Sequence, residues 1–153
     1  MEIKNRKMTE NNVIFKNSGY QIKRDNRCCR CGGSYMLTKH HIVPSCYIKY
    51  LRYRIKNKLK EDHCYYYEWD YCCLCHKCHL KYETYFSNEL HQLIWDTYDI
   101  NIKETSYRQP HSGLPKPSEK VMEKIKSKED YLELRELCTK FFVDKMEPAY
   151  TLI

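Results

Sequence analysis

The stretch CCLCHKCHLKYE, residues 72–83, places four cysteines, two histidines and a glutamate within twelve positions. Thiolates, imidazoles and carboxylates are the side chains with which proteins bind transition metals. These residues hold either one ion or two. The difference decides whether the chain only folds around a metal or also does chemistry with a second one.

A second cysteine group, RCCRCGG at residues 27–33, lies upstream of this stretch. Cys28 and Cys31 are separated by two residues, and so are Cys75 and Cys78. A two-residue gap lets both sulfurs of a pair turn toward one ion, and two pairs complete a tetrahedral four-sulfur zinc site. Such a site is closed to water and structural, so folding should depend on zinc.

The choice of these four ligands is open at the level of sequence, because other cysteines stand beside them. Cys72 and Cys75 have the same two-residue spacing, and Cys29 and Cys73 are direct neighbours of the chosen residues. We expect the cysteines outside both groups to be buried or idle thiols: Cys46, Cys64 and Cys138.

The size and composition of the chain favour metal binding over a disulfide framework. The chain has 153 residues and ten cysteines, and its N-terminus is polar, without the apolar core of a signal peptide. No apolar run approaches the ~20 residues that a membrane span needs. We therefore expect an intracellular protein, cytoplasmic or nuclear, in which thiols stay reduced.

The positive charge of the chain is concentrated in its first part. Residues 1–60 carry 15 Lys and Arg against 3 Asp and Glu, whereas residues 61–153 carry 12 against 17, so the net charges are +12 and −5. A basic half of this kind is typical of proteins that bind a polyanion, most often nucleic acid.

The hydrophobic pattern predicts an α+β fold built around the two cysteine groups. The segments YMLTKHHIVP and YYYEWDYCCLC have the composition of strands, and apolar residues recur at helical spacing in residues 46–60 and 77–96. A last helix is expected from Ser118, as its cap, to about Lys145. The predicted organisation is a tail with a short strand at 1–22, a core at 23–100, a proline-rich linker at 101–118 and a C-terminal helix at 119–153.

The predicted helix at residues 46–60 carries its charge on one face, interleaved with tyrosines. This arrangement is typical of a half-buried surface helix and also of a nucleic-acid contact. The candidate nucleic-acid-binding residues are Lys39, Lys49, Arg52, Lys56 and Lys60.

The sequence HHIVP at residues 40–44, followed by DYCCLCHKCH at residues 70–79, resembles the HNH endonucleases and their ββα-metal fold. It is also similar to the HNH-type segment of some 3′–5′ exonuclease-like proteins. The resemblance covers about Cys28 to Ser87. In the family an Asn stands nine positions before the last motif histidine, whereas this chain has Asp70 there.

The resemblance implies a metal-dependent endonuclease that hydrolyses DNA, or alternatively RNA, and leaves a 5′ phosphate. His41 would be the general base and Asp70 would position it, although an ionised Asp cannot donate a hydrogen bond as Asn does. His40, His79 and Glu83 would hold the catalytic ion. Imidazole suits zinc, nickel or manganese and carboxylate suits magnesium, so we expect Mg²⁺ or Mn²⁺ there beside the structural Zn²⁺.

One obstacle and two alternative functions come from the residues themselves. His40 and His41 are adjacent, and adjacent side chains of a regular strand point to opposite faces. The alternatives are a non-catalytic, zinc-ribbon-like module that binds nucleic acid and a zinc-stapled protein that binds other proteins. Salt-sensitive binding without cleavage would indicate the first alternative, and neither activity would indicate the second.

Overall fold

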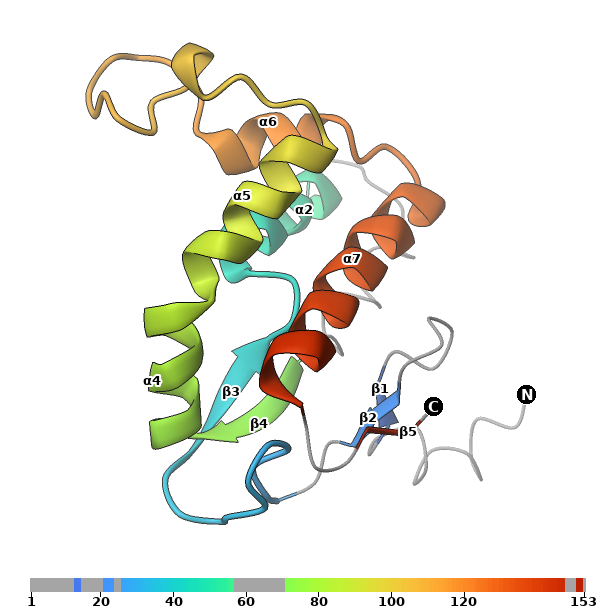
Figure 1. The fold of residues 1–153 in the computed structure, drawn as a ribbon. Helices are drawn as coiled ribbons and strands as arrows, with labels where there is room; N and C mark the ends of the chain where they lie inside the picture. Colours follow the sequence, from blue (N-terminus) through green and yellow to red (C-terminus); the bar gives the residue numbers. More distant parts are fainter. Residues whose placement is uncertain (1–12, 15–20, 24–25, 57–70, 148–150, 153) are drawn as a thin grey trace.

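The computed structural model describes residues 13–14, 21–23, 26–56, 71–147 and 151–152, and its fold is α+β, as the sequence predicts. Figure 1 shows helices gathered around a small antiparallel pair of strands, β3 (Leu37–His41) and β4 (Tyr71–Cys75). A separate three-stranded sheet joins β1 (Val13–Ile14), β2 (Gln21–Lys23) and β5 (Thr151–Leu152). The described helices and strands therefore include both strands predicted to carry the site.

The pairing of β3 with β4 sets which side chains meet the rest of the protein. His40 lies opposite Cys72, and Thr38 lies opposite Leu74. The side chains of His40, Cys72 and Leu74 are buried, whereas Lys39 is exposed. The alternation of a regular strand thus turns Thr38 and His40 toward the interior.

The segment predicted as one helix at 77–96 is two consecutive helices. They are α4 (His76–Tyr85) and α5 (Ser87–Thr97), separated at Phe86, whose φ of −122° departs from helical geometry. The break bends the chain, so that α4 packs against β3 and β4 while α5 packs against α6 and α7.

The predicted basic helix is α2 (Ser45–Lys56), which begins directly after Pro44. The carbonyl of Pro44 accepts hydrogen bonds from the amides of Tyr47 and Ile48, which starts the first turn. Tyr47 and Ile48 are fully buried and Lys49 is exposed, so the described part of this helix is amphipathic.

Residues 101–118, predicted as a linker, fold back on themselves and pack against the helices. A 3-10 turn covers Ile102–Glu104, the amide of Ser106 donates to the carbonyl of Pro115, and Thr105 is buried. The hydrogen bond holds the two ends of this loop together. The part of this segment before α6 is therefore a loop whose two ends are joined by a hydrogen bond.

The C-terminal part contains two helices where one was predicted. They are α6 (Pro117–Glu123) and α7 (Lys128–Met146). Ser118, the predicted cap, lies inside α6 and is buried; the capping serine is Ser127, whose hydroxyl accepts a hydrogen bond from the amide of Asp130 at the start of α7. The spacing of apolar residues runs through the break and conceals it.

Candidate metal centres

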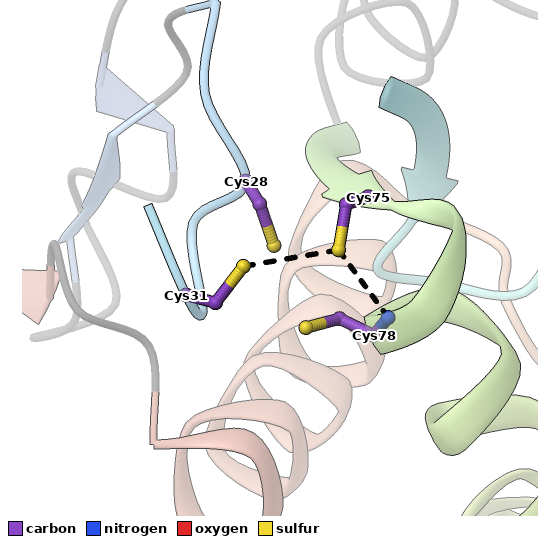
Figure 2. A group of neighbouring side chains, drawn as sticks. All are labelled: Cys28, Cys31, Cys75 and Cys78. Carbon is purple, nitrogen blue, oxygen red and sulfur yellow. Dashed lines mark hydrogen bonds between the residues drawn. The ribbon is translucent and has the colours of Figure 1, made fainter. Parts of the chain in front are cut away.

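Four cysteines from two distant parts of the chain meet at one point. Cys28 and Cys31 lie in the loop before β3, Cys75 ends β4, and Cys78 lies in the first turn of α4. Their sulfur atoms all lie within 4.8 Å of one another. Figure 2 shows the four side chains pointing toward a common centre. These are the four ligands that the paired spacing predicts.

The geometry of this cluster suits a tetrahedral metal ion. The sulfurs of Cys31 and Cys75 are 3.8 Å apart, and a tetrahedron with zinc–sulfur bonds of ~2.3 Å has edges of about 3.8 Å. The amides of Gly33 and Cys78 donate to the sulfurs of Cys31 and Cys75, respectively, each at 3.4 Å. Because hydrogen bonds from amides stabilise thiolates, the four cysteines could hold a metal such as zinc.

The turn that carries the first pair depends on glycine. Gly32 has a φ of +80°, in the left-handed region, and its amide donates to the carbonyl of Cys28. A side chain at this position would be strained, so the turn requires glycine at residue 32.

The thiols of Cys28 and Cys78 have pKa values shifted in opposite directions. Burial raises the pKa of the Cys28 thiol, but hydrogen bonds from the backbone at Cys31, Cys75 and Arg30 outweigh it and lower that pKa to about 7. Burial and the neighbouring thiols raise the pKa of Cys78 to about 12. Thiolates this close repel one another, and a divalent cation removes the repulsion.

The neighbouring cysteines form a separate pair beside this cluster. The sulfurs of Cys29 and Cys72 lie 3.5 Å apart in the core, and both residues are fully buried. Burial raises the pKa of the Cys72 thiol, which keeps it protonated. Among the other cysteines, Cys46 and Cys73 are half-buried and Cys138 is buried, while Cys64 lies outside the described residues. The geometry therefore favours Cys75 with Cys78 over Cys72 with Cys75.

A second potential ligand group lies where β3 meets α4. Nε2 of His79 is 3.4 Å from Nδ1 of His40 and 3.6 Å from a carboxylate oxygen of Glu83. One ligand atom from each of the three residues lies within 4.8 Å of the others. His79 and Glu83 share a face of α4 because they are four residues apart. Three ligands leave coordination positions open for water or a substrate, unlike the four-cysteine cluster.

Thr38 fixes the orientation and the tautomer of His79. Its hydroxyl is 2.7 Å from the carbonyl oxygen of Leu74, which can only accept, and 2.7 Å from Nδ1 of His79. The hydroxyl proton goes to Leu74, so the hydroxyl oxygen accepts the Nδ1 proton. Nε2 of His79 then carries a lone pair toward His40 and Glu83, as a metal ligand requires.

His40 is held neutral by its surroundings. It is 4% exposed, and burial, followed by the nearby His79 and His41, lowers its pKa to about 3. Its ring stacks on Phe142 of α7 at 5.2 Å and meets the ring of Tyr82 edge-on at 4.5 Å. A neutral imidazole is the form that binds a metal.

His41 lies in the same cleft as the ligand group, despite its opposite direction on the strand. A cavity of about 360 Å³ is lined by Lys39, His40, His41, Pro44, Ser45, Cys46, His79, Tyr82, Glu83, Ser87 and His91. His41 is half-buried and packs near Tyr71, whose ring also lies 4.5 Å from the ammonium of Lys39. The cleft is thus lined by side chains from both faces of β3, at the end of the strand where His40 and His41 lie.

The structure leaves several predicted site residues untested. Asp70 and Lys60 lie outside the described residues, as do the side chains of Arg52 and Lys56. Lys49 is exposed, with its ammonium 5.4 Å from the ring centre of Tyr50. Two residues beside the histidine group, Thr38 and Phe142, were not predicted from the sequence. Thr38 stands two positions before His40, so strand alternation could have placed it on the same face. No sequence pattern connects Phe142 with His40.

No family model, no curated protein and no solved structure matches this chain. Among the described helices, none has both the length and the apolar character needed to cross a bilayer.

Proposed function

We propose that the chain is a metal-dependent endonuclease of the HNH type, with a ββα-metal core formed by β3, β4 and α4. The observation that carries the proposal is the shared cleft of His40, His41, His79 and Glu83. It adjoins the cysteine cluster because Cys78 and His79 are neighbours on α4. Zn²⁺ at the cysteines would be structural, and Mg²⁺ or Mn²⁺ at the second group would be catalytic.

Two of the three proposed ligands, His40 and His79, are kept ready for metal binding by their surroundings. Thr38 keeps the lone pair of His79 directed into the cleft, and burial keeps His40 neutral. His40, His79 and Glu83 would hold a divalent cation, which would supply neutralisation of the negative charge that builds up on the phosphate during cleavage. Because Thr38 and the buried surroundings of His40 hold the two imidazoles in place, these ligands need not reorient while the phosphate reacts.

His41 removes the proton from the attacking water. The water oxygen forms a bond to phosphorus, the bond from phosphorus to the 3′ oxygen breaks, and the water proton goes to the imidazole. Histidine suits this task because its ordinary pKa of ~6.5 leaves a neutral ring at neutral pH. Lys39 is exposed at the rim of the cleft and is suited to hold a DNA phosphate.

Plasmid nicking tests the proposal. The zinc-loaded protein is incubated with supercoiled plasmid and Mg²⁺, Mn²⁺ or Ni²⁺, beside His41→Ala and the matched control His76→Ala. His76 is exposed on α4 and does not line the cleft. We expect nicking by the wild type and by His76→Ala, and a loss of at least about a hundredfold in His41→Ala.

Two outcomes would count against the proposal. Equal nicking by His41→Ala removes His41 as the base. Salt-sensitive DNA binding with no cleavage by any of the three ions points instead to the non-catalytic, nucleic-acid-binding module.

A further inference from the structure

A second cavity lies beside the metal cleft and is lined mainly by residues of α2, α5 and α6. Figure 1 shows these three helices at the same end of the molecule. Its volume is about 450 Å³. Cys46 and His91 line both this cavity and the metal cleft. These two residues form a shared wall, so the two cavities are direct neighbours.

Aromatic side chains form much of the wall of this cavity. The rings of His91 and Trp95 lie nearly parallel, 5.9 Å apart with 27° between their planes, and Tyr107 meets Trp95 edge-on at 5.0 Å. The hydroxyl of Tyr47 is 2.9 Å from Nδ1 of His91 and holds the imidazole in place. Such rings offer flat apolar surfaces to a planar ligand.

Core packing explains some of these rings but not all of them. Tyr47 is fully buried and Trp95 is 8% exposed, as in an ordinary core. Tyr107 is 50% exposed, although it stands directly against Trp95. An exposed tyrosine at the mouth of an aromatic cavity is positioned to stack on an incoming group.

The remaining lining residues are polar and suit a nucleotide. Asn88 and Gln92 have amide groups that both donate and accept hydrogen bonds, as the edges of bases do. Lys116 brings a positive charge to the wall, and the guanidinium of Arg108 lies 5.9 Å from the ring centre of Tyr107. Aromatic rings flanked by cations are the usual means of binding single-stranded nucleic acid.

We propose that this cavity binds an unpaired nucleotide adjacent to the phosphate that is hydrolysed. The inference rests on the proposed function for the role of the metal cleft, and it adds the substrate class. A cavity of this size takes one small ligand and not a duplex. The base must therefore be single-stranded or leave its stack. Stacking accepts every base, so the cavity selects unpaired nucleotides and not a sequence.

Fluorescence of Trp95 tests the proposal directly. The chain has two tryptophans, and Trp69→Phe leaves Trp95 as the single one. His41→Ala is added so that the DNA stays intact. We expect a single-stranded oligonucleotide to quench Trp95 at concentrations at least tenfold lower than the matched duplex does, because only an unpaired base can stack in the cavity.

A second measurement does not depend on tryptophan fluorescence or on the Trp69→Phe variant. Binding of a labelled single strand to the otherwise unmodified protein, without added divalent ion, is compared between Tyr107→Ala and Tyr85→Ala. Tyr85 is 69% exposed on α4 and lies outside the cavity. We expect Tyr107→Ala to weaken binding by about tenfold and Tyr85→Ala to leave it unchanged.

The outcomes separate this inference from the proposed function. Equal quenching by single strand and duplex, or unchanged binding by Tyr107→Ala, overturns the nucleotide site even if plasmid is nicked. Single-strand binding that depends on Tyr107, without cleavage by any ion, supports the nucleotide site and removes the hydrolysis.

Discussion

The hydroxyl of Thr38 on β3 lies 2.7 Å from Nδ1 of His79 on α4. The same hydroxyl donates to the carbonyl of Leu74, so a single side chain links both strands to the helix. The contact leaves only one tautomer for His79. Thr38 thus orients His79 in the group of His40, His79 and Glu83, although Thr38 is not itself one of the potential metal ligands.

Replacing Thr38 should weaken metal binding at His79 without changing the ligands. Thr38→Val keeps the shape and the strand preference of the side chain but removes the hydroxyl. We expect Mn²⁺ affinity to fall about 10- to 100-fold, measured by calorimetric titration of the zinc-loaded protein. Thr38→Ser retains the hydroxyl and should bind Mn²⁺ nearly as the wild type does. Equal affinities in the two variants would refute the role given to the hydroxyl.

The cysteine cluster predicts one tightly held zinc per chain and identifies its ligands. Cys31→Ser should lose the metal and unfold, because the cluster joins the loop before β3 to α4. The double variant Cys29→Ala with Cys72→Ala should keep one zinc and lose only about 0.5–3 kcal/mol per site. Elemental analysis and circular dichroism check both. A zinc-free Cys31→Ser protein with native structure would contradict this assignment.

Acid should destabilise the fold partly through His91. Burial lowers the pKa of His91 in the folded protein, so the unfolded chain takes up its proton first, near pH ~6.5. The contribution of His91 to the free energy of unfolding is therefore complete above this pH. It decreases as the pH drops toward the lowered pKa that His91 has in the folded protein. Urea unfolding at pH 7 and 5.5 measures the loss.

The matched variant for this measurement is His91→Gln, which cannot titrate and can still bond to Tyr47. Its stability should fall less between the two pH values than that of the wild type. Acid weakening of the cysteine cluster is common to both proteins and drops out of the comparison. Identical losses would show that His91 does not contribute.

Two lysines should contribute separately to DNA affinity. Lys39 at the cleft and Lys49 on α2 are both exposed. If each contacts one phosphate, Lys39→Gln or Lys49→Gln reduces the slope of log affinity against log salt by about one. Fluorescence anisotropy at several salt concentrations measures the slope. Lys140→Gln, an exposed lysine on α7, is the control and should leave the slope unchanged.

The sequence was sufficient for the parts of the site that depend on short spacings. Two residues lie between the cysteines of each pair, and three lie between His79 and Glu83. These spacings correspond to fixed local geometries, so the proximity of the side chains within each pair could be predicted from them. The strand rule predicts that His40 and His41 point to opposite faces of a regular strand, and His40 is buried while His41 is half-buried. The rule alone does not predict that His41 also lines the cleft at the end of β3, because the shape of a strand end depends on what packs around it.

The contributions of remote residues could not be predicted. Phe142 packs on His40 across a gap of 102 positions, and no periodic pattern relates the two. The helix breaks at Phe86 and at residues 124–127 were missed because apolar spacing continues through them. Such features arise from tertiary packing, which overrides local preference.

The stacking of Phe142 on His40 also has a consequence for the order of synthesis. Phe142 follows Glu83 by 59 residues, so the ribosome releases all three ligands well before the ring that backs them. A nascent chain then has the ligands while His40 still lacks its apolar support. The burial of His40 is therefore completed only after α7 has been synthesised and has docked.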